Sequence, residues 1–94
     1  MQNRQVKPGR PAGSTTFEPL LAQAFGIVIR ERRKKDGISQ EALAHLSRIE
    51  RSHMGKIERG EHLPSLPMVL RLAQVLNCKP GILVDLAAEM ADAS

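Results

Sequence analysis

Apolar residues recur along this chain every three or four positions, and no stretch alternates between apolar and polar residues. That spacing places side chains on one face of a helix, so the pattern predicts helices and no strands. The first predicted helix begins at residues 15–16 and runs to Asp36, with Pro19 in its first turn and Gly37 as its left-handed stop. Its apolar stripe consists of Leu21, Ala24, Phe25, Val28 and Ile29.

Two short helices joined by a tight turn follow, over residues 39–47 and 50–59. Small residues in the first allow a neighbouring helix to come close. In the second, Met54 and Ile57 lie three positions apart and face the interior. The residues left facing outward are Arg51, Ser52, Gly55, Lys56 and Arg59.

The pattern predicts a fourth helix capped by Ser65 and a fifth that begins at Pro80, with Asn77 as a left-handed cap between them. The inner face of the fourth is expected to hold Leu66, Val69, Leu70, Ala73 and Leu76. The fifth is expected to carry Ile82, Leu83, Leu86, Ala87 and Met90. Residues 17–94 are therefore expected to form one all-α domain, a compact five-helix bundle.

Composition agrees with a small helical bundle, because the only aromatic residues are Phe17 and Phe25 and the core must be filled by aliphatic side chains. No apolar run approaches the roughly 20 residues that a membrane-spanning helix needs. The one cysteine, Cys78, excludes an intrachain disulfide and fits a reducing compartment. We therefore expect a cytoplasmic protein with no membrane contact.

Charge is unevenly distributed along the chain, whose formal net charge is +4. Residues 30–36 carry five bases against two acids, whereas residues 81–94 carry three acids and no base. A basic region and an acidic end fit a nucleic-acid binder with a separate partner face. A solvated surface of uneven charge is the alternative.

Several short motifs appear in a fixed order. They are Phe25-Gly26-x-x-Ile29-Arg30-x-x-Arg33, Gly37-Ile38-Ser39-Gln40-Glu41-x-Leu43-Ala44, Ile57-Glu58-Arg59-Gly60, Pro64-Ser65-Leu66 and Leu72-Ala73-x-x-Leu76. Together, over residues 25–83, they resemble the phage-repressor and Cro (XRE) class of helix-turn-helix DNA-binding proteins. The resemblance implies a lambda-repressor-like bundle whose helix-turn-helix core spans residues 39–60.

An apolar back and a small, basic front suit residues 50–59 to the major groove of DNA. Matched to the family, the DNA-binding positions are Gln40, Arg51, Ser52, His53, Gly55, Lys56 and Arg59. Arg51 is expected to give two parallel hydrogen bonds to a guanine. Lys56 is expected at a guanine or a phosphate, Gln40 at a phosphate, and His53 near the sugar–phosphate edge. Further phosphate contacts are expected from some of Arg30, Lys34 and Lys35.

The resemblance also implies a salt bridge between Arg33 and Glu58. Two positions depart from the family pattern. Arg48 stands in the turn where the family usually has glycine, and a residue with a side chain at positive φ costs about 1 kcal/mol. Glu50 stands where Ser, Thr or Asp usually caps the third helix.

Residues 1–16 contain two glycines, two prolines and few large apolar groups, so we expect a flexible basic arm. Within it, the run Lys7-Pro8-Gly9-Arg10-Pro11 resembles an AT-hook, whose arginine lies in a narrow minor groove. Arg10 is therefore a candidate DNA contact, and an inert leader is the alternative.

The expected function is sequence-specific regulation of transcription on double-stranded DNA. One recognition helix contacts few bases, so we expect a symmetric homodimer on a palindromic site, paired through Leu86 and Met90 of the last helix. The alternative is an antitoxin-like or adaptor protein that binds another protein through its acidic tail, residues 85–94.

Catalysis is not expected. The metal-ligand and nucleophile types of note are His45, His53, His62 and Cys78, whose spacings match no zinc pattern. No enzyme activity, cofactor or metal is therefore predicted.

Overall fold

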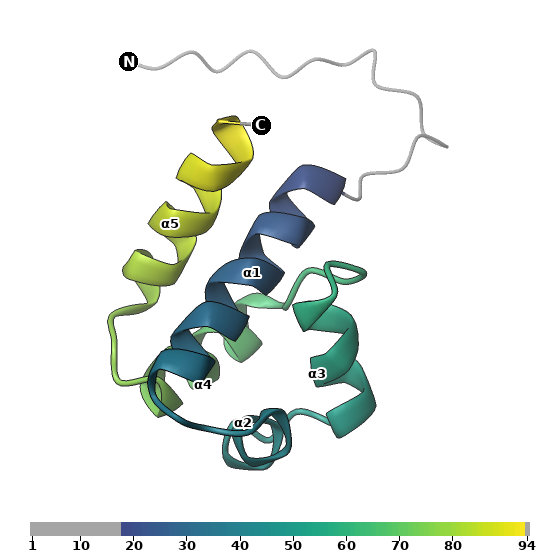
Figure 1. The fold of residues 1–94 in the computed structure, drawn as a ribbon, viewed down its shortest axis with the longest axis vertical. Coiled ribbons are helices and arrows are strands. Elements are labelled where there is room, and N and C mark those ends of the chain that lie inside the picture. Colours follow the sequence, from purple (N-terminus) through teal and green to yellow (C-terminus); the bar gives the residue numbers. More distant parts are fainter. Residues whose placement is uncertain (1–17, 94) are drawn as a thin grey trace.

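The computed structural model describes residues 18–93, which form five helices and, within that range, no strand (Figure 1). The helices are α1 (Pro19–Lys35), α2 (Gln40–Leu46), α3 (Arg51–Glu58), α4 (Leu66–Val75) and α5 (Pro80–Asp92). The long helices α1 and α5 pack side by side and run in opposite directions, α3 lies on the other flank of α1, and α2 lies near the C-terminal end of α1 (Figure 1). No helix within residues 18–93 is long and apolar enough to cross a membrane. The predicted all-α five-helix bundle is confirmed.

Helix α1 begins later than the sequence pattern predicts. Glu18 precedes it with a non-helical backbone, and its carbonyl accepts the first helical hydrogen bond from Ala22 at 2.8 Å. Pro19 is therefore the first helical residue, a position where a missing N–H leaves no bond unmade. Residues 15–16, the predicted start, lie outside the described residues.

The first four helices end in the same way. The residue after each C-cap has positive φ: Gly37 (73°), Arg48 (57°), Gly60 (77°) and Asn77 (55°). In each case its N–H and the next N–H bond to carbonyls of the last helical turn, which is the Schellman arrangement. Arg48 accordingly adopts the glycine-like conformation of the α2–α3 turn despite its side chain.

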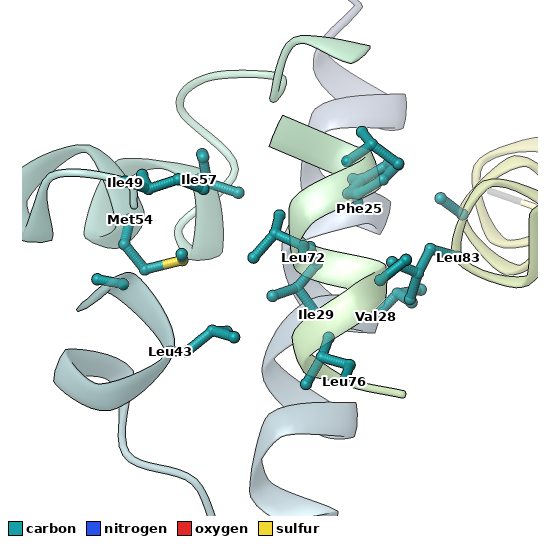
Figure 2. Packing of buried hydrophobic residues seen from close by; sticks show 14 of the residues in the cluster. Phe25, Val28, Ile29, Leu43, Ile49, Met54, Ile57, Leu72, Leu76 and Leu83 are labelled. Carbon is teal, nitrogen blue, oxygen red and sulfur yellow. The ribbon is translucent and has the colours of Figure 1, made fainter. Parts of the chain in front are cut away.

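In the core, α1 and α4 lie in the middle, with the two short helices α2 and α3 on one side and α5 on the other (Figure 2). Ile29 of α1, Leu43 of α2, Met54 and Ile57 of α3, and Leu83 of α5 are all fully buried. The expected stripe on α1 is confirmed, since its residues are buried except Leu21, which is partly buried.

Helices α1 and α3 are close enough that their backbones touch at Gly26. A Cβ at that position would lie 2.5 Å from the carbonyl oxygen of Ile57 and 2.7 Å from that of Glu58. Such distances are too short for any side chain. Glycine at position 26 therefore sets the distance between α1 and the helix expected to contact DNA.

The predicted inner faces of α4 and α5 are partly wrong. On α4, Leu66 and Leu70 are 68% and 49% exposed, and Leu72 is buried instead. Three leucines on ten residues of helix fit more than one stripe, so spacing alone did not identify the buried one. On α5, Ile82 and Leu86 are 40% and 42% exposed. The residues of α5 that pack on the core are Leu83, Ala87, Met90 and Ala91.

Candidate nucleic-acid interface

Helix α3 presents a polar face to solvent because its apolar face is fixed in the core. Met54 and Ile57 are fully buried, whereas Arg51, Ser52 and Lys56 on the opposite side are exposed. The helix has eight residues and lies at the outer edge of the bundle (Figure 1). This is the amphipathic arrangement that the sequence predicts for residues 50–59.

Six of the seven expected DNA-binding residues line one shallow depression on this face, which we call the α3 hollow. They are Gln40, Arg51, Ser52, Gly55, Lys56 and Arg59. The folding of α2 against α3 thus brings Gln40, distant in sequence, beside the exposed face of α3. The structure assembles the set, and whether these residues contact DNA remains a prediction.

Gly55 forms the floor of the α3 hollow, on the outward face that the sequence predicts, but it is buried there. A Cβ there would lie 3.0 Å from Nη1 of Arg59 and 3.7 Å from Oε1 of Gln40. The position is on the outer face of α3, but these two long side chains cover it. Its lack of a side chain lets them approach the helix backbone.

Glu58 connects three elements of the bundle through one buried carboxylate. Arg33 of α1 donates from Nε to Oε2 at 2.7 Å and from Nη2 to Oε1 at 2.9 Å. Gln40 of α2 donates from Nε2 to Oε1 at 3.0 Å. The third guanidinium nitrogen, Arg33 Nη1, donates to the carbonyl of Ile38 at 3.0 Å. The expected ion pair is present, and it extends to Gln40.

Burial strengthens the attraction between Arg33 and Glu58 within this cluster of Arg33, Gln40 and Glu58. The side chains of Arg33 and Glu58 are 11% and 3% exposed, so water screens their attraction weakly. The hydrogen bond to Glu58 raises the pKa of Arg33, and burial opposes that shift only in part. The pair therefore fixes the orientation of α3 relative to α1.

Arg59 at the end of α3 is held by a second, exposed ion pair. Its Nε donates to Oε2 of Glu61 at 2.9 Å, and its Nη2 to Oε1 at 3.4 Å. This hydrogen bond raises the pKa of Arg59 and lowers the pKa of Glu61. Because the carboxylate pKa is lowered, the pair persists as pH falls until the pH passes below that pKa.

The start of α3 is less constrained. The Glu50 side chain makes no capping hydrogen bond within residues 18–93, in line with the expectation that it caps poorly. Arg51 Nη1 lies 4.0 Å from Glu41 Oε2, and both side chains are 72% exposed. A contact this long and this exposed leaves the Arg51 guanidinium available to a ligand.

His53 does not line the α3 hollow. Its ring meets that of His62 edge to face, with centroids 5.4 Å apart. The side chain is partly buried and directed toward the loop after α3. Of the other candidates, Arg30, Lys34 and Lys35 are exposed on α1, and Arg10 lies outside the described residues.

Sequence reasoning missed two partners at this face. Glu61 binds Arg59 across Gly60, and Gln40 binds Glu58 from a different helix. The first has a local signal, since an arginine before a helix-ending glycine and an acid after it can meet around the turn. The second depends on packing and has no such signal.

Comparison with known proteins supports the family resemblance. The helix-turn-helix model HTH_3 matches residues 29–83. Over 58 residues the chain is 43% identical to the uncharacterized HTH-type transcriptional regulator YazB of Bacillus subtilis, covering 62% of this chain and 84% of that one.

Two solved structures share the fold. The clp gene regulator ClgR of Corynebacterium glutamicum is 26% identical with a TM-score of 0.74, over 81% of each chain. The restriction-modification controller protein C.AhdI of Aeromonas hydrophila is 44% identical with a TM-score of 0.64, over 66% of this chain and 94% of its own. These relatives are regulators and not enzymes. The chain belongs to the XRE-type helix-turn-helix family of transcriptional regulators.

Proposed function

We propose that this protein binds a specific DNA operator by placing α3 in the major groove, and that it regulates transcription from that site in the cytoplasm. The observation that carries the proposal is the α3 hollow, where cationic and hydrogen-bonding side chains gather on an exposed helix face. Buried Met54, Ile57 and Glu58 hold that face rigid from behind. A small amphipathic helix of this kind matches the width of the major groove.

Individual roles follow from position and hydrogen-bonding capacity. Arg51, at the first turn of α3 and highly exposed, is assigned to a guanine, whose O6 and N7 accept two parallel bonds. Lys56 is assigned to a guanine or a phosphate. Gln40 uses one amide N–H on Glu58 and has a second for a phosphate oxygen. Ser52 is assigned to a base edge, and His53 and Arg59 complete the set near the sugar–phosphate backbone of the DNA.

A symmetric dimer is the expected binding unit, because one α3 contacts too few bases to define a site in a genome. We assign the pairing surface to α5, where Leu86 is 42% exposed and Met90 is partly buried beside it. Two half-sites about one helical turn apart would then form a palindromic operator.

The base-contact assignment is tested by selecting bound sites from random DNA with the native protein and with Arg51→Ala. Loss of a bidentate pair removes about 1–3 kcal/mol of discrimination against a wrong base. We expect the variant to lose preference at one position in each half-site while the other positions stay unchanged. An identical motif from both proteins would contradict the role of Arg51, and a native protein that selects no motif would contradict sequence-specific binding.

The similarity to C.AhdI favours a more specific role, control of a restriction-modification operon. Binding of the selected motif upstream of such genes would support it. The acidic tail, residues 85–94, is the surface for the alternative role as an antitoxin-like or adaptor protein. Co-purification with a neighbour protein and no DNA affinity would favour that alternative.

A further inference from the structure

Arg59 occupies an unusual place among the residues of the α3 hollow because a nearby acid already binds it. The Arg59 side chain is 60% exposed, and the carboxylate of Glu61, whose side chain is 51% exposed, accepts hydrogen bonds from both Nε and Nη2. The third nitrogen, Nη1, lies over Gly55, 3.0 Å from where a Cβ would sit. The side chain therefore folds back along α3 and reaches the hollow with its charge already neutralised.

Gly60 makes this geometry possible. Its positive φ of 77° turns the chain directly after α3, which brings Glu61 back toward Arg59 two residues earlier. The Glu61 N–H bonds to the carbonyl of Lys56 at 2.9 Å, so the backbone that carries the carboxylate is ordered. The backbone turn that ends α3 therefore places the Glu61 carboxylate beside Arg59.

We propose that Glu61 competes with DNA phosphate for Arg59 and thereby limits the affinity and the salt dependence of binding. The inference rests on the proposed function. A phosphate that binds Arg59 has to displace a carboxylate, and the displaced carboxylate then lies close to the phosphate chain. Contact at Arg59 thus adds less to binding than contact at an unpaired arginine would.

Counterion release makes the competition measurable. Each phosphate neutralised by a cationic side chain steepens the plot of log affinity against log salt by about 0.9. While Arg59 stays paired with Glu61 it neutralises no phosphate and adds nothing to that slope. Removing the charge of Glu61 restores the full contribution.

The test is a double-mutant cycle on the selected operator, with affinities measured over a range of salt concentrations. We expect Glu61→Gln to bind about threefold more tightly at low salt, with a slope steeper by about 0.9. In an Arg59→Gln background the same substitution should leave the slope unchanged and give a smaller gain in affinity, because it then removes only the repulsion between the carboxylate and the phosphates. Glu31→Gln on α1, also exposed, is the control for an equal change in net charge.

Two results would overturn the proposal. An equal gain in both backgrounds would mean that Glu61 acts as a general negative charge, and weaker binding by Glu61→Gln would mean that it orients Arg59 productively. A native protein with no salt-dependent binding to any selected DNA would instead refute the proposed function. Matching thermal melts of the variants show that the fold is unchanged.

Discussion

At the scale of single residues, Gly26 does most to determine where α3 lies. It is the point where the backbone of α1 touches the backbone of α3, at residues 57–58. Backbone carbonyls cannot rotate away as a side chain does, so a larger residue has to separate the helices. The family motif includes this glycine, but its structural reason is visible only in the packed structure.

We therefore expect Gly26→Ala to lower the free energy of unfolding by about 3 kcal/mol, the upper part of the range for overpacked cores. Thermal or urea unfolding measures the loss. Gly81→Ala is the matched control, because no described atom lies within 4 Å of a Cβ at that site on α5. Stability of that variant should stay the same or rise slightly. Equal losses in both variants would contradict the close-contact explanation.

At the scale of helices, local signals predicted the ends better than the faces. Ser39 and Ser65 accept hydrogen bonds from Ala42 and Met68 as N-caps, and the stops at Gly37 and Asn77 are confirmed. These depend on side chains within one turn, which the sequence shows directly. The buried face of α4 depends on how the helix is rotated in the bundle. Because leucines occur on more than one face of this helix, the sequence pattern could not identify the buried one.

The same contrast applies to the candidate interface. Helical spacing predicted that Arg51, Ser52 and Lys56 lie on the face opposite Met54 and Ile57, as they do. It did not predict which charges bind one another, because ion pairs such as Arg59–Glu61 form around turns and across helices.

The cluster of Arg33, Gln40 and Glu58 joins helices α1, α2 and α3, so its loss should lower the free energy of unfolding of the whole bundle. We expect Glu58→Gln, which keeps the shape of the side chain, to cost about 3 kcal/mol because it leaves the buried Arg33 charge uncompensated. Denaturant unfolding measures the change. Glu61→Gln removes the exposed pair of the same type and should leave the melting temperature unchanged. A stable Glu58→Gln protein would show that the Arg33 guanidinium finds another partner.

At the scale of the whole molecule, α5 carries three exposed large apolar side chains, more than any other helix within residues 18–93. Ile82, Val84 and Leu86 are each at least 40% exposed although α5 also packs against α1 and α4. Ile82 and Leu86 lie one turn apart on one flank of the buried Leu83, and Val84 lies on the other flank. The sequence pattern counted Ile82 and Leu86 as core, whereas the structure leaves them available to a partner.

If two copies pair through α5 on the side of Leu86, then Leu86→Lys should shift the protein toward monomer and weaken operator binding. Sedimentation equilibrium and gel shift measure the two effects. Val84→Lys removes a similar exposed apolar group, 45% against 42% exposed, from the other flank and should keep the dimer. A monomeric native protein, or equal effects of both substitutions, would contradict this pairing surface.

The anchoring of Glu58 has a consequence for how such a protein acquires new targets. With Arg33 and Gln40 clamping the carboxylate, α3 has little freedom to tilt or slide as its solvent-facing residues are exchanged. New target preference then has to come from replacing individual side chains on a fixed scaffold. Substituting positions 51, 52 and 56 together, with the hydrogen bonds to Glu58 left intact, should transfer the target preference of one regulator to another without redesigning the domain.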